Sequence, residues 1–198
     1  MVDVSELKRS LPPYSVATVE DLKKSNASEL PIRKKSEHFQ FPLNIQDKFD
    51  VVLVMEKFRK QKFYSGLAAP QLGILKRLIV FTIPRSETND LCRTKVFLNP
   101  TYEKVGDDMI DDIECCASVR NVVASVPRYA RIRYQAFDIK GGSIEGEVTG
   151  TTAQLIQHEV DHLDGKLFID LVSPDKLMSV KGYIRFLENK NFQTESSN

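Results

Sequence analysis

The sequence predicts an α+β domain of mostly antiparallel strands, with one helix before the strands and one after them. Short apolar stretches rich in β-branched residues follow one another between residues 77 and 150, and helical patterns flank them on both sides. Strands and helices segregated along the chain in this way are typical of α+β proteins. The chain has 198 residues, which is the length of one domain, so we expect a single domain over residues 1–198.

The first helix is expected at residues 45–62, after an irregular N-terminal segment. Residues 1–43 are polar and interrupted by prolines, as in "LPPYS" and "FQFPLN", and predict loops with short elements. Asn44 is a favourable N-cap for the stretch "IQDKFDVVLVMEKFRKQK" that follows. The centre of this stretch, "VVLVM", is also compatible with a strand.

Several strands are expected between the two helices. Residues 130–139 alternate in polarity through Ile132, Tyr134 and Ala136, and Gly141 and Gly142 then predict a turn. The predicted strands cover residues 77–84, 95–100, 101–105, 130–139 and 143–150.

The second helix is expected between Thr151 and Gly165. The stretch "TTAQ", residues 151–154, has the spacing of a capping box, and Gly165 is well placed just past the end of the helix. Ile156, Val160 and Leu163 lie on one face, which predicts packing against the sheet.

A metal site is expected on the opposite face of this helix. His158 and His162 are four residues apart, so both imidazoles can bind one ion, and Glu159 can reach a water on that ion. Leu155 lies on the same face. A surface helix with incidental histidines is the alternative, but the H-E-x-x-H spacing has a chemical mechanism behind it and favours the metal.

The sequence leaves the third ligand of this site open. Cys116 in "DIECCASV" offers a thiolate, which is a strong ligand for soft metals. Simple burial is the alternative for both Cys115 and Cys116, because free cysteines are often buried. Glu188 in "YIRFLENK" is the only acid of the tail on a plausible helix, and it would suit a metallopeptidase.

The composition excludes several classes of protein. Lys and Arg number 28 and Asp and Glu 27, for a net charge of +1, which argues against direct DNA binding or a membrane-surface protein. No apolar run is long enough to span a membrane, and the N-terminus has no signal-peptide core. Three cysteines, two of them adjacent, do not suggest a disulfide framework. We therefore expect a cytoplasmic protein.

Three segments together resemble the peptide deformylase family. They are "YSGLAAPQ" (residues 64–71), "ECCAS" (residues 114–118) and "QHEVDH" (residues 157–162), in the order in which the family carries its motifs. The resemblance covers roughly residues 40–175 and is far more specific than one H-E-x-x-H. It implies antiparallel sheets around a central metal-binding helix.

The resemblance also implies a role for each matching residue. Glu114 and Arg128 match a pair that braces the site in relatives. The other implied roles are metal binding by Cys116, His158 and His162; general acid–base catalysis by Glu159; oxyanion binding by the Gln71 amide and the Ala117 N–H; pairing with the substrate backbone by Ser65 and Gly66; and an apolar pocket for methionine near Leu155.

The reaction implied by the resemblance is hydrolysis of the N-formyl group from N-formyl-methionyl peptides. The implied cofactor is one divalent ion, natively Fe(II), which Zn(II), Ni(II) or Co(II) can replace. We expect a monomer that acts on nascent chains beside the ribosome. Two alternatives stay open: a metallopeptidase with Glu188 as third ligand, and a peptide-binding module without turnover.

Three residues depart from the family pattern. Tyr64 and Cys115 stand where relatives have glycine, and Ala117 replaces a bulkier residue. These changes leave every chemical group in place and bear on substrate specificity and turnover. At the C-terminus, apolar spacing through Leu177, Val180, Ile184 and Leu187 predicts a helix packed on the domain, and residues 191–198 predict a mobile tail.

Overall fold

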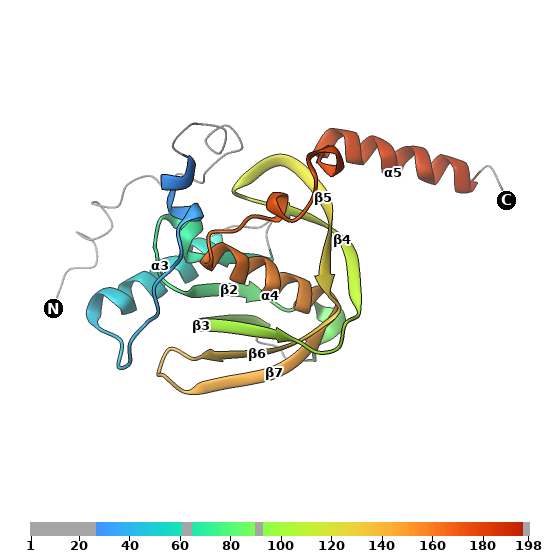
Figure 1. Ribbon diagram of the computed structural model, residues 1–198. Helices are drawn as coiled ribbons and strands as arrows, with labels where there is room; N and C mark the ends of the chain where they lie inside the picture. The colour runs from blue at the N-terminus through green and yellow to red at the C-terminus, as the bar shows by residue number, and fades with distance from the viewer. Residues whose placement is uncertain (1–26, 61–64, 90–92, 196–198) are drawn as a thin grey trace.

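The computed structural model describes residues 27–60, 65–89 and 93–195, and its helices and strands form an α+β fold (Figure 1). None of the helices in these ranges is long and apolar enough to cross a membrane. Tyr64 and residues 61–62 of the expected first helix lie outside the described residues.

The larger sheet has five antiparallel strands in the order β1–β2–β3–β6–β7. These strands are β1 (Gly66–Ala68), β2 (Leu78–Thr82), β3 (Thr94–Lys104), β6 (Arg131–Phe137) and β7 (Ser143–Thr149). The strand predictions are confirmed, with one difference. The two strands expected at residues 95–105 form one continuous strand, β3, whose register shifts between Leu98 and Thr101.

Two long helices cover the two faces of this sheet. They are α3 (Ile45–Lys60) and α4 (Gly150–Leu163). Because side chains alternate along a strand, Phe81 of β2 packs in the cluster that contains α4, whereas its neighbour Val80 packs with α3. Asn44 caps α3 as predicted, since its Oδ1 accepts the Asp47 N–H at 2.8 Å.

A second sheet has no counterpart among the strand predictions. Its strands are β4 (Met109–Cys116), β5 (Val119–Tyr129) and β8 (Met178–Ser179), in the order β4–β5–β8. Buried Val119, Ala124 and Val126 pack against Leu167 and Phe168, which follow α4 in the chain. Figure 1 shows α4 lying between this sheet and the larger one.

The N-terminus of α4 is capped differently from the prediction. The helix begins at Gly150, and its N-cap residue Thr149 makes no side-chain capping bond, so the expected capping box is wrong. Instead the Glu87 carboxylate accepts the N–H groups of Thr151 and Thr152 at 3.1 and 3.0 Å. At the other end Gly165, with φ of 74°, follows the helix as predicted.

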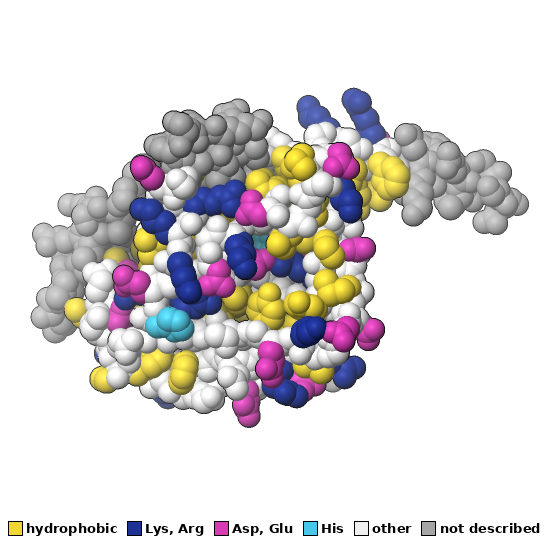
Figure 2. All heavy atoms as spheres, in the orientation of Figure 1, with side chains coloured by type: hydrophobic (Ala, Val, Ile, Leu, Met, Phe, Trp, Pro, Cys, Tyr) yellow, Lys and Arg dark blue, Asp and Glu magenta, His cyan; other side chains and the backbone are white. Residues whose placement is uncertain are grey.

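The C-terminal helix α5 (Val180–Glu195) extends away from the domain (Figure 1). The expected packing is wrong for Ile184 and Leu187, which are 48% and 40% exposed. Leu177 does pack beside the second sheet. Figure 2 shows hydrophobic side chains gathered where α5 leaves the domain, whereas charges of both signs are scattered over the rest of that face. The helix continues to Glu195, beyond the start of the predicted tail.

Candidate active site

The fold brings two imidazoles and one thiolate together. His158 and His162 lie one turn apart on α4, and Cys116 ends β4. The Cys116 Sγ is 3.3 Å from the His162 Nε2, and one ligand atom from each of the three residues lies within 4.8 Å of the others. All three side chains are buried.

This donor set fits a divalent metal ion. Tetrahedral bonds of about 2.3 Å to sulfur and about 2.0 Å to nitrogen place the two donor atoms about 3.5 Å apart, close to the observed Cys116–His162 separation. A thiolate with two imidazoles suits zinc and ferrous iron. Cys116, His158 and His162 could therefore hold one ion.

The electrostatics favour the thiolate form of Cys116. Burial alone raises the pKa of this thiol, but the neighbouring His162 and His158 imidazoles outweigh burial and hold the pKa well below its ordinary value. A metal ligand has to be deprotonated, so the pocket prepares the sulfur for binding.

His158 is oriented by a buried carboxylate. Its Nδ1 lies 2.7 Å from the Glu114 Oε2. Arg128 binds both oxygens of Glu114, at 2.7 and 3.0 Å. Burial raises the pKa of Glu114, but the bonds from His158 and Arg128 outweigh burial and lower it to about 2. The ionised carboxylate accepts the Nδ1–H, so the Nε2 is the nitrogen that a metal ion would bind. Burial lowers the pKa of His158, but bonds to Cys116 and Glu114 outweigh burial and raise this pKa well above its ordinary value, so metal binding would displace a proton from the ring.

Asp161 completes this network from the helix itself. The Arg128 Nη1 donates to the Asp161 Oδ2 at 2.5 Å. Because Asp161 lies on the same helix as both histidines, Arg128 ties β5 to the metal-binding turn of α4. The sequence motif places Asp161 beside His162, but nothing in the motif indicates that Asp161 pairs with Arg128.

Glu159 lies beside the donor atoms with one oxygen unpaired. Its side chain is buried, and its Oε2 has no hydrogen-bond partner among the described residues. Burial raises the pKa of Glu159 to about 7. A carboxyl group with this pKa can accept and release a proton near neutral pH, as a general acid–base requires.

Gly66 leaves the space that Glu159 fills. A Cβ added at Gly66 would lie 2.2 Å from the Glu159 Oε1. Any larger residue at position 66 would therefore displace the carboxylate.

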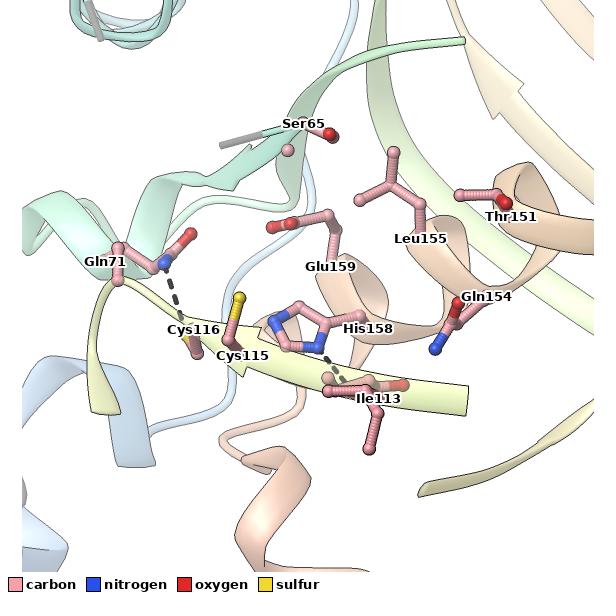
Figure 3. Close-up of a pocket in the computed structure, with 13 residues that line it drawn as sticks. Ser65, Gln71, Ile113, Cys115, Cys116, Thr151, Gln154, Leu155, His158 and Glu159 are labelled. Carbon is pink, nitrogen blue, oxygen red and sulfur yellow. Dashed lines mark hydrogen bonds and ion pairs between the residues drawn. The ribbon is translucent and has the colours of Figure 1, made fainter. Parts of the chain in front are cut away.

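Gln71 reaches the thiolate from the opposite wall (Figure 3). Its Oε1 accepts the Ala68 N–H at 2.7 Å, which orients the amide. Its Nε2 lies 3.7 Å from the Cys116 Sγ and donates to the Ser118 Oγ at 3.2 Å. Sequence reasoning missed Ser118, which follows Ala117 in the turn between β4 and β5.

A pocket of about 190 Å³ opens beside these residues. Cys115 points into it next to Cys116 (Figure 3). Of the metal-binding, catalytic and substrate-binding residues named from the sequence, all but His162 line it; the full lining is Ser65, Gly66, Gln71, Ile113, Glu114, Cys115, Cys116, Ala117, Thr151, Gln154, Leu155, His158 and Glu159. Gln154 and Thr151 were not among the residues expected there.

Glu188 is not part of this cluster in the described residues. It is exposed on α5 and is not among the residues grouped around the two histidines in the described part of the chain. The metallopeptidase alternative therefore lacks its third ligand. The site combines a thiolate, two imidazoles and a buried carboxylate. This set of groups is typical of a mononuclear metal-dependent hydrolase.

Comparisons with known proteins identify the family. The family model of polypeptide deformylase matches residues 25–178. A protein of Rickettsia conorii described as peptide deformylase 2 is 34% identical over 197 residues, which cover 93% of this chain and 96% of the relative. A Thermodesulfovibrio yellowstonii peptide deformylase is 40% identical over 131 residues, which cover 66% of this chain and 72% of the relative. The chain belongs to the polypeptide deformylase family.

Solved structures agree with this assignment. A plant peptide deformylase is similar with a TM-score of 0.68 and 27% identity, over 92% of each chain. The peptide deformylase of Plasmodium falciparum is similar with a TM-score of 0.66 and 25% identity, over 94% of this chain and 98% of the other.

Proposed function

We propose that this protein removes the N-formyl group from the formyl-methionine at the start of nascent polypeptides. The observation that carries the proposal is the buried Glu159 Oε2, which is unpaired among the described residues and whose carboxylate interacts electrostatically with His158, His162 and Cys116. A carboxylate in this position can accept a proton from a water molecule that attacks a carbonyl group.

One divalent ion would be held by Cys116, His158 and His162. When bound, it supplies a Lewis acid that polarises the formyl oxygen and lowers the pKa of water from 15.7 toward about 7. We infer Fe(II) as the native ion from membership of the deformylase family. Zn(II), Ni(II) or Co(II) would be able to replace it, because a thiolate with two imidazoles suits these ions as well.

The chain's own residues carry the proton and hold the substrate. Glu159 accepts the proton of the attacking water at its carboxylate and then delivers it to the leaving amine. The Gln71 amide and the Ala117 N–H donate hydrogen bonds to the formyl oxygen and stabilise the negative charge that develops on it. Ser65 and Gly66, at the start of β1, pair with the peptide backbone of the substrate in the manner of an added strand.

We further infer a monomer that works in the cytoplasm beside the ribosome, where formylated N-termini emerge. Sedimentation of the purified protein tests the monomer, and co-sedimentation with ribosomes at low and high salt tests the association. Salt dependence would indicate contacts between exposed charges.

Formate release from a short formyl-methionyl peptide is the decisive assay. The protein is purified without oxygen and loaded with Fe(II), and Glu159→Ala serves as the matched control. We expect release by the wild type and a loss of at least about 100-fold in the variant, because general acid–base catalysis contributes that much. Well-metallated wild type that binds the peptide but releases no formate would overturn the proposal in favour of a peptide-binding module.

A further inference from the structure

Two glutamines of α4, three residues apart, differ in their hydrogen bonding. Gln157 is fully paired: its Oε1 accepts the Tyr129 N–H at 3.0 Å, and its Nε2 donates to the Tyr129 and Ala153 carbonyl oxygens at 3.0 Å each. Gln154 is also buried, with 8% of its surface exposed. Its amide has no hydrogen-bond partner among the described residues.

The unpaired amide of Gln154 faces the substrate pocket. Gln154 lines the pocket one turn before His158, and Figure 3 shows its amide directed from α4 toward β4, on the side of Ile113. The Gln154 amide atoms are not among the fully buried polar atoms without a partner, so solvent in the pocket still reaches them. A ligand that displaces this solvent without replacing its hydrogen bonds costs free energy, because it leaves the amide unpaired. A ligand group in the pocket that carries an acceptor would satisfy it.

The part of the pocket near Gln154 is where a substrate side chain fits. Leu155 and Ile113 supply apolar walls. At the other end of the pocket lie Glu159 and the metal ligand His158. A formyl group placed at those ligands leaves the first side chain of the substrate to extend along α4. Its outer atoms then lie beside the Gln154 amide.

We propose that Gln154 is a specificity-determining residue that selects a first side chain carrying a hydrogen-bond acceptor. This inference rests on the proposed function and narrows the class of substrates that the same site would prefer. The thioether of methionine is a weak acceptor. Its sulfoxide is a much stronger one, and norleucine, with a methylene in place of sulfur, has none. The expected order of preference is formyl-methionine sulfoxide, then formyl-methionine, then formyl-norleucine.

The test compares kcat/KM for three peptides that differ only in this first residue. In the wild type we expect the sulfoxide peptide to exceed the norleucine peptide by about 10-fold or more, the effect of one hydrogen bond. In Gln154→Leu, which keeps the size but removes the amide, the order should reverse. Gln135→Leu makes the same chemical change at an exposed position of β6 and should keep the wild-type order.

Binding provides a second readout that does not depend on turnover. Calorimetric titration of the three peptides into metal-loaded Glu159→Ala, with and without Gln154→Leu, should show the same reversal in Kd. If wild type and Gln154→Leu both release formate with the same order of preference among the three peptides, this inference is overturned and the proposed function stands. No formate from any of the three peptides would overturn both.

Discussion

Glu114 and His158 are joined across 44 residues of sequence by a 2.7 Å contact between a carboxylate oxygen and the Nδ1 of the imidazole. The contact fixes which nitrogen of His158 faces the metal site. Arg128 binds both oxygens of the same carboxylate. One buried acid therefore controls the orientation of a ligand without binding the ion itself.

Replacing this acid tests its control over the site. We expect Glu114→Gln to weaken metal binding about 10- to 100-fold, because the neutral amide no longer stabilises the required tautomer and leaves Arg128 partly unpaired. Competition with a chelator measures the affinity. Glu103→Gln removes an acid from an exposed ion pair with Arg133 and should leave affinity unchanged. Equal affinities in both variants would refute the role of Glu114.

The identity of the third ligand is tested by a pair of substitutions. Cys116→Ser should lose tight binding of the ion, because a serine hydroxyl is a far weaker ligand than a thiolate. Glu188→Ala should bind the ion as the wild type does, because Glu188 is exposed on α5. Absorption of the Co(II)-loaded proteins reports directly on sulfur ligation. The opposite pattern would restore the metallopeptidase interpretation.

The space beside Glu159 is tested by adding one methyl group. In Gly66→Ala the new Cβ would collide with the Glu159 Oε1, so we expect kcat to fall about 100-fold, as for a misplacement of about 1 Å. Metal content should stay unchanged, because no ligand moves. Gly182→Ala on α5 is the control, since its Cβ would meet only the Ser179 hydroxyl, at 3.1 Å. Unchanged kcat in Gly66→Ala would show that Glu159 tolerates displacement.

The cap of α4 gives a pH-dependent contribution to stability. Burial raises the pKa of Glu87, but its bonds to Thr152 and Thr151 outweigh burial and lower the pKa below 4.5. A lowered folded-state pKa means that the stabilisation is complete above about pH 4.5 and is lost as the pH falls through the folded value.

We therefore expect Glu87→Gln to lower the free energy of unfolding by about 1 kcal/mol at pH 7 and by much less at pH 3. Urea unfolding at the two pH values measures the difference. Glu145→Gln, at an exposed position on β7, should cost little at either pH. A cost for Glu87→Gln that does not change with pH would exclude the charged cap.

The sequence predicted the parts of the molecule whose signals are local. The spacing of His158 and His162 placed two imidazoles on one face of a helix, and the alternation in residues 130–139 identified β6. Strand β4 escaped prediction because "MIDDIECC" has exposed acids where an apolar strand is expected, and its regularity comes from pairing with β5. Local patterns cannot reveal a strand that is specified mainly by its partner.

Partners distant in sequence account for the remaining differences. The cap of α4 comes from Glu87, 65 residues before Thr152, so the local "TTAQ" spacing was misleading. Sequence likewise gives no sign that the Gln157 amide is fully paired and the Gln154 amide is not, because both are glutamines on one short helix. Only the position of Tyr129 on β5 makes one of them structural.

The distance in sequence between Cys116 and His162, 46 residues, also has a consequence for biosynthesis. Domains fold as units once their parts have left the ribosome, and here the thiol is synthesised well before either imidazole. A chain interrupted before α4 carries Cys115 and Cys116 as two neighbouring thiols with no metal to protect them. Until the helix is made, a metal ion would therefore find only one of its three ligands on the growing chain.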